Sequence, residues 1–152
     1  MNGDPLKNHN KKFMDLLKES KAKPNLVIRI SDRYIIKWRW DRNLTEELVL
    51  IFGGIATNNI DNVGGLAFTV DGAITFGVVY EYLTKEITKE GNDLIVCDIP
   101  VSGVDILLII GVFSSVLHGD FTYNDRNVIS DLNNYEKFLS NFMSMIDVDL
   151  TR

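Results

Sequence analysis

The longest apolar stretch of the chain, residues 106–117, constrains the fold more than any other feature. It reads ILLIIGVFSSVL, twelve residues without a charge. Ser102 followed three residues later by Asp105 is typical of a helix start, and Gly119 is typical of a helix end. A membrane span needs about 20 residues, so this helix does not cross a bilayer. Because it is apolar on almost every side, the rest of the domain must cover it.

The rest of the chain alternates between strand and helix patterns. β-like apolar runs bounded by turn signals predict strands over residues 26–30, 34–40, 66–70, 73–82 and 94–99, with Asp71-Gly72 as a hairpin turn. Apolar residues at three- and four-residue steps, together with capping signals, predict helices over residues 5–20, 43–55, 102–117 and about 125–145. The predicted order is α-β-β-α-β-β-β-α-α. With 152 residues and 45% apolar side chains, we expect a single α+β domain, residues 1–152, in which helices pack an antiparallel sheet of about five strands.

The clearest strand pattern is that of residues 34–40, which separates two kinds of side chain. Successive side chains of a strand point to opposite faces. The two faces hold Tyr34, Ile36, Trp38 and Trp40 on one side, and Ile35, Lys37 and Arg39 on the other. We therefore expect the two indoles to lie in the core and the cations to face water.

Charge is divided unevenly along the sequence. Residues 1–42 carry eleven bases and five acids, a net charge of +6, whereas the remaining 110 residues carry five bases and sixteen acids, a net charge of −11. Such asymmetry indicates how a chain meets its partners rather than how it folds.

The basic third suggests one possible function. Lys37, Arg39 and Arg42 alternate with the two tryptophans, and cations beside aromatic rings are typical of surfaces that hold single-stranded nucleic acid. The strand alternation opposes this interpretation, because it puts the cations and the indoles on different faces. A nucleic-acid-associated protein that uses residues 1–42 is the alternative hypothesis.

Candidate chemical groups each have a structural explanation. Cys97 lies in an apolar predicted strand without an adjacent cation, which predicts a buried, inert thiol. His118 with Asp120 and Asp125 combines metal-ligand residue types, but the spacing matches no ligand pattern, and a histidine near a helix end or an aspartate at an N-cap is commonplace. The glycine pairs at 53–54 and 64–65 fit no phosphate-binding loop. We expect no catalytic residue, no metal site and no cofactor, so the chain is not expected to be an enzyme.

The function expected from the sequence is therefore protein binding. An acidic surface suits a basic protein partner, because complementary charge accelerates association. We assign the partner-binding charges to Asp120, Asp125 and Asp131, around the start of the last predicted helix. The expected class is an immunity or antitoxin-like inhibitor, or a chaperone for one client. The lone cysteine and the absence of a signal-peptide pattern favour the cytoplasm, without membrane attachment.

Overall fold

The computed structural model describes residues 26–57, 62–63, 66–67, 70–117 and 129–150. The elements are β1 (Arg33–Asp41), α2 (Arg42–Ala56), β2 (Asn62–Val63), β3 (Leu66–Ala67), α3 (Val70–Ile87), β4 (Leu94–Ser102), α4 (Gly103–Leu117), α5 (Leu132–Asn141), the 3-10 helix η1 (Phe142–Met145) and β5 (Ile146–Val148). The fold class is α+β, as the sequence predicts. The predicted helix over residues 5–20 lies outside the described residues.

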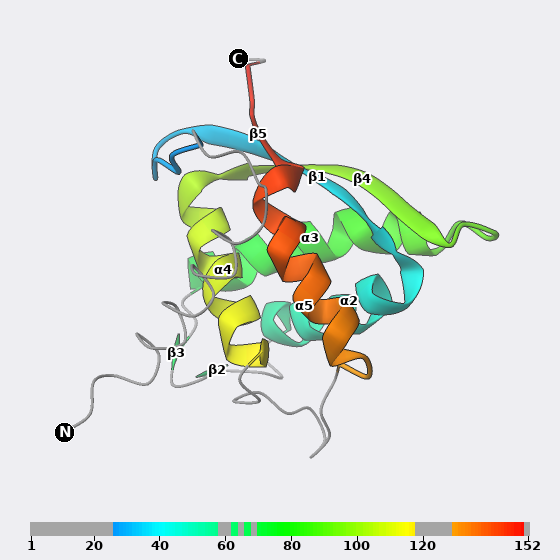
Figure 1. Cartoon of the computed structure of the whole chain (residues 1–152). Helices are drawn as coiled ribbons and strands as arrows, with labels where there is room; N and C mark the ends of the chain where they lie inside the picture. The colour runs from blue at the N-terminus through cyan, green and yellow to red at the C-terminus, as the bar shows by residue number, and fades with distance from the viewer. Residues whose placement is uncertain (1–25, 58–61, 64–65, 68–69, 118–128, 151–152) are drawn as a thin grey trace.

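The main sheet is antiparallel and has three strands in the order β4-β1-β5. Helices α2, α3, α4 and α5 all lie on the same side of it, and no helix of the described residues covers the opposite face (Figure 1). β2 and β3 form a separate pair of two-residue strands. The predicted sheet of about five strands and the predicted element order are therefore wrong.

Strand β1 confirms the expected alternation. Tyr34, Ile36 and Trp38 are buried, whereas Lys37 is exposed and Trp40 is partly buried. The Trp38 ring centroid lies 5.1 Å from that of Phe138 on α5 and 6.5 Å from that of Phe52 on α2. Its indole thus joins the sheet to two helices at the centre of the core.

The apolar helix α4 is confirmed, together with its start signal. The Ser102 N–H donates to Asp105 Oδ2 (2.8 Å), and the Asp105 N–H donates to Ser102 Oγ (3.3 Å). This reciprocal pair is a capping box. The helix is buried along most of its length, and the Tyr135 hydroxyl of α5 donates to the Phe113 carbonyl (2.7 Å).

The predicted hairpin around Asp71-Gly72 is wrong, because residues 70–87 form helix α3. The buried side chains Phe76, Val79 and Leu83 are spaced three and four residues apart. They form one helical face, and the Phe76 ring stacks on Phe52 of α2 with centroids 5.7 Å apart. Packing against the core therefore overrides the local turn signal.

The two ends of the described core also differ from the prediction. Residues 26–30 form no strand; the Tyr34 hydroxyl holds them instead, accepting from the Arg29 N–H (2.9 Å) and donating to the Val27 carbonyl (3.1 Å). The last predicted helix ends earlier than expected, and Ile146 begins β5 and pairs with Ile36 of β1. Ile146 is buried like the apolar residues of the preceding helix. It therefore continues their spacing in the sequence although it belongs to a strand.

Candidate functional site at the edge of strand β4

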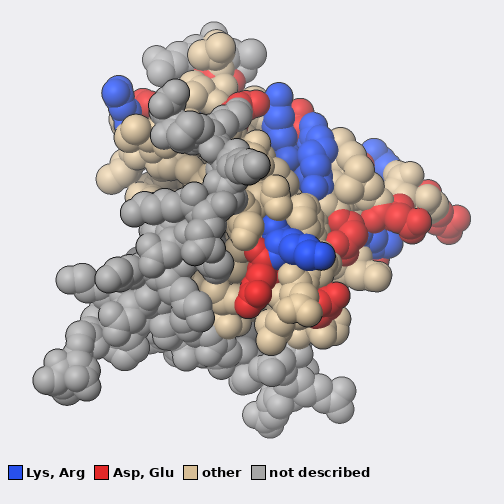
Figure 2. Space-filling view, in the orientation of Figure 1, with Lys and Arg blue, Asp and Glu red and all other residues tan. Residues whose placement is uncertain are grey.

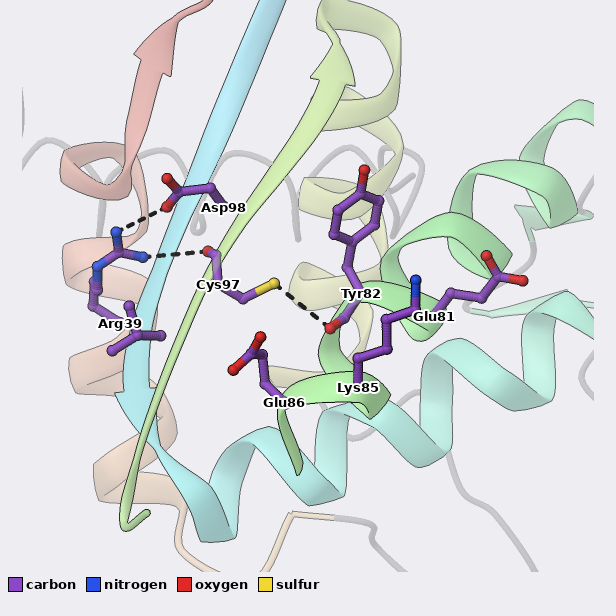
Figure 3. Close-up of a pocket in the computed structure, with 8 residues that line it drawn as sticks. Arg39, Glu81, Tyr82, Lys85, Glu86, Cys97 and Asp98 are labelled. Carbon is purple, nitrogen blue, oxygen red and sulfur yellow. Dashed lines mark hydrogen bonds and ion pairs between the residues drawn. The ribbon is translucent and has the colours of Figure 1, made fainter. Parts of the chain in front are cut away.

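A pocket of about 580 Å³ lies between helix α3 and strand β4. Its lining residues are Arg39, Glu81, Tyr82, Lys85, Glu86, Val96, Cys97 and Asp98. Figure 3 shows Cys97 pointing from β4 toward the backbone of Tyr82, while Arg39 and Asp98 lie on the opposite side of the strand. The pocket therefore borders the side of β4 that faces away from β1.

The local structure explains how these side chains come together. On α3, burial of Phe76, Val79 and Leu83 turns Glu81 and Lys85 outward. On β4, alternation puts Cys97 on the inner face and Val96 and Asp98 on the outer face. The sequence prediction missed this site because it assigned residues 73–82 to a strand. The helical spacing of the apolar residues was the signal that could have revealed it.

The Cys97 thiol is buried and lies 3.6 Å from the Tyr82 carbonyl oxygen. Burial raises its pKa to about 11, and the nearby carboxylates of Glu86 and Asp98 contribute to the increase. A thiol with this pKa is almost entirely protonated near neutral pH, and the thiolate is the nucleophilic form. The structure thus confirms the expected burial and gives the thiol little nucleophilic character.

The charged side chains of the pocket differ in how they are paired. The Arg39 guanidinium contacts Asp98 Oδ1 (2.8 Å) and donates to the Trp38 and Cys97 carbonyls. Glu86 contacts Lys89 (3.1 Å). Within the described part of the chain, Glu81 and Lys85 have no ion pair.

The segment from α3 to β4 forms an acidic surface. Residues 81–98 contain five acids, Glu81, Glu86, Glu90, Asp93 and Asp98, against two bases, Lys85 and Lys89, a net charge of −3. In Figure 2, red side chains gather toward the right-hand tip of the molecule, where Figure 1 places the turn between α3 and β4. We refer to residues 81–98 as the α3–β4 acidic surface.

The acids assigned to partner binding from the sequence lie elsewhere. Asp120 and Asp125, like His118, lie outside the described residues. Asp131 is exposed and is the N-cap of α5, where its Oδ1 accepts from the Asn134 N–H (3.1 Å). Asp131 therefore stabilises the helix start whatever else it binds.

The three cations of the nucleic-acid alternative are all engaged within the fold. Lys37 pairs with Asp147 of β5 (3.2 Å), and Arg39 pairs with Asp98. Arg42 donates to the carbonyls of Ile87 (2.7 Å), Lys89 (2.8 Å) and Asn92 (2.6 Å), and its Nη1 also lies 3.4 Å from Glu46. Arg42 thus holds the turn that connects α3 to β4.

Comparison with known proteins gives no family assignment: no protein-family model, curated protein or solved structure matches the chain. Among the described residues, no three or more His, Cys, Asp or Glu side chains gather in a geometry that could hold a metal ion. In the same part of the chain, no helix has the length and hydropathy of a membrane span.

Proposed function

We propose that this chain is a non-catalytic protein-binding domain that neutralises or escorts a specific basic protein partner, of the immunity, antitoxin or client-chaperone type. The observation that carries the proposal is the α3–β4 acidic surface beside an open pocket. Asp98 pairs with Arg39 and Glu86 pairs with Lys89, whereas Glu81, Glu90 and Asp93 form no ion pair among the described residues. Its remaining negative charge is therefore available to a partner.

Charge on this surface would act mainly on the rate of association. Complementary potentials steer two proteins together, while exposed rim pairs add little affinity of their own. Affinity would come from a few buried contacts in the pocket, where Val96 and Tyr82 offer apolar surface. The free, buried thiol of Cys97 suits a reducing compartment, so we also propose a cytoplasmic location.

The proposal is tested by capturing the partner and measuring its binding. The tagged full chain is used to capture a protein from cells of its source, and the complex is remade from purified components. The partner is expected to be basic and to associate faster at low ionic strength. Failure to capture a partner, or capture of an acidic one with salt-independent kinetics, contradicts the proposal.

The α3–β4 acidic surface and the acids assigned from the sequence, Asp120, Asp125 and Asp131, are compared with charge-neutralising variants of the same chain. Asn is as good an N-cap as Asp, so Asp131→Asn removes charge while keeping the start of α5. One variant combines Asp120→Asn, Asp125→Asn and Asp131→Asn, and the other combines Glu81→Gln and Glu86→Gln. The variant that slows association several-fold at low salt identifies the surface that meets the partner.

The nucleic-acid alternative has a separate test. Lys37, Arg39 and Arg42 are engaged in the fold, which leaves them less available to phosphate. Binding of single-stranded oligonucleotides with a steep salt dependence, lost on neutralising Lys37 and Arg39, favours this alternative. Absence of such binding at low salt excludes it.

A further inference from the structure

The hydrogen-bonding pattern shows which backbone groups of β4 face away from β1. Arg42 N donates to the Asp93 carbonyl (2.7 Å), and Gly103 N donates to the Asp32 carbonyl (3.0 Å). These two bonds bracket the β1–β4 ladder and continue its register. In an antiparallel pair, hydrogen-bonded and non-hydrogen-bonded positions alternate. The even-numbered residues of β4 therefore direct their N–H and C=O groups away from β1, including Pro100, whose missing N–H costs the ladder nothing.

Within the part of the chain that the structure describes, this outer edge of β4 has hydrogen-bonding groups without a strand partner. Among the described residues, β1 is the sole strand paired with β4. Leu94, Val96 and Asp98 each present an N–H and a C=O at this edge, and Pro100 presents a C=O. The Ser102 N–H is taken by Asp105. Such an edge is a template for another strand.

The pocket beside α3 gives an added strand a place to lie. It borders this edge and is lined from both faces of β4, by Cys97 on the inner face and by Val96 and Asp98 on the outer face. A strand pairs at about 4.8 Å from its neighbour, with side chains alternating between the two faces. One set of its side chains would then enter the pocket next to Tyr82 (Figure 3).

We propose that an extended, basic segment of a protein partner adds to the β4 edge as a fourth strand, beside the pocket that α3 borders, with its cations facing Glu81, Glu86 and Asp98. This inference rests on the proposed function and specifies its binding mode. Main-chain hydrogen bonds would supply affinity, and alternate side chains would supply specificity.

Charge selects this occupant over a second copy of the chain. The pocket beside the edge is lined by three acids, Glu81, Glu86 and Asp98, against two bases, Arg39 and Lys85, a net charge of −1. A second copy would bring the same acids to the same edge, and like charges placed together oppose pairing. A basic segment meets complementary charge instead.

Amide hydrogen exchange of the labelled full chain tests the edge before any ligand is added. The amides of Ile95, Cys97 and Ile99, which bond to β1, should exchange slowly, whereas those of Val96 and Asp98 should exchange about tenfold faster or more. Equal protection of the even- and odd-numbered amides would overturn the proposal, since the edge would already be covered.

The binding probe is a short peptide that alternates valine with lysine, titrated into the labelled chain by NMR. We expect saturable binding with a Kd below about 1 mM and new protection of the Val96 and Asp98 amides. A peptide that alternates valine with glutamate should not bind. The same valine-lysine peptide with alternate N-methylated amides should also fail, because it lacks the donors. Binding that leaves the Val96 and Asp98 amides unprotected, or no binding at all, overturns the proposal.

Variants of the chain separate main-chain pairing from charge. Val96→Pro removes one edge-facing N–H at a position equivalent to Pro100 and should abolish peptide binding. Glu81→Lys should weaken binding several-fold, with Glu136→Lys on α5 as the matched control that does not. If Val96→Pro does not fold, the N-methylated peptide still decides the outcome.

Two further readouts distinguish this inference from the proposed function and from self-association. If the full chain captures a partner and Val96→Pro captures it equally well, the proposed protein-binding function is supported and strand addition at β4 is wrong. If the valine-lysine peptide adds at β4 and no partner is captured, strand addition at β4 is supported and the proposed protein-binding function is wrong. A concentration-dependent dimer in sedimentation, lost in Val96→Pro, would replace the basic segment with a second copy.

Discussion

The indole N–H of Trp38 on β1 donates to Thr45 Oγ1 on α2 across 3.0 Å, and both residues are almost completely buried. The same hydroxyl donates to the Asp41 carbonyl (2.8 Å), and the Asp41 carboxylate caps α2 through the Leu44 N–H (2.9 Å). One threonine thus connects the central strand to the start of the helix that follows it.

Thr45→Val should therefore destabilise the fold. It leaves a buried indole N–H without an acceptor, at a cost of about 1–3 kcal/mol in the free energy of unfolding. Thr45→Ser keeps the hydroxyl and should lose less than about 1 kcal/mol. Denaturant unfolding of both variants measures the difference. Equal stability of Thr45→Val and the wild type would show that the hydrogen bond contributes nothing.

Two neighbouring serines of α4 should respond in opposite directions. Ser114 is fully buried, and its Oγ has no hydrogen-bond partner among the described residues, whereas Ser115 Oγ donates to the Gly111 carbonyl (3.2 Å). Ser114→Ala should be neutral or stabilise by up to about 1 kcal/mol, and Ser115→Ala should destabilise by about 0.5–1.5 kcal/mol. Thermal unfolding of the two variants checks the prediction, and a larger loss from Ser114→Ala would contradict it.

Arg42 should be irreplaceable by lysine. Its guanidinium donates to three carbonyls at the end of α3 and in the following turn, and a lysine ammonium cannot reproduce that fork. Arg42→Lys should cost about 2 kcal/mol of stability, since hydrogen bonds from charged groups are among the stronger ones. Arg33→Lys, at an exposed position on β1, is the matched control and should change stability by less than about 0.5 kcal/mol. Similar stabilities of the two variants would show that the three hydrogen bonds of Arg42 do not stabilise the turn.

The Cys97 thiol should react slowly with alkylating reagents in the folded chain. With its pKa raised from 9.0 to about 11, the thiolate fraction at pH 8 falls, and alkylation should be about one hundredfold slower than in denaturant. Mass spectrometry of iodoacetamide-treated protein measures both rates, and equal rates would show that the thiol is exposed.

The same pKa change gives a pH dependence of stability. The thiol ionises at a lower pH in the unfolded chain than in the folded one. The protonated thiol therefore contributes fully to the free energy of unfolding below pH 9, and this contribution is lost as the pH rises toward 11. Cys97→Ala should therefore lose less stability than the wild type over that interval. Parallel stability curves for the two proteins would show that Cys97 has the same pKa in both states.

The sequence predicted elements whose signals are local. Alternation over residues 34–40 identified β1, and Ser102 with Asp105 identified the start of α4, because each pattern is complete within a few residues. Residues 70–82 were assigned wrongly because the local signal of Asp71-Gly72 competes with packing of Phe76 on Phe52, which depends on distant parts of the chain. β5 was missed because Ile146 continues the apolar spacing of the preceding helix.

The candidate site was less accessible to sequence analysis than the fold. The five acids of residues 81–98 are visible in the sequence. They gather beside the edge of β4 because residues 70–87 form a helix and because β4 is an edge strand of the sheet. The local sequence pattern shows neither of these features. Asp131 shows a further limit of sequence patterns: the acid assigned to partner binding also caps α5, and the sequence does not separate the two roles.

The most direct test of the account is the association rate constant of the purified partner with the full chain, measured at low and high ionic strength. We expect the constant to fall steeply as salt is added, because complementary charge steers the encounter. Glu81→Lys should lower it several-fold at low salt, and Glu136→Lys should leave it near the wild-type value. A rate constant that is independent of salt and equal in all three proteins would contradict an acidic docking surface for a basic partner.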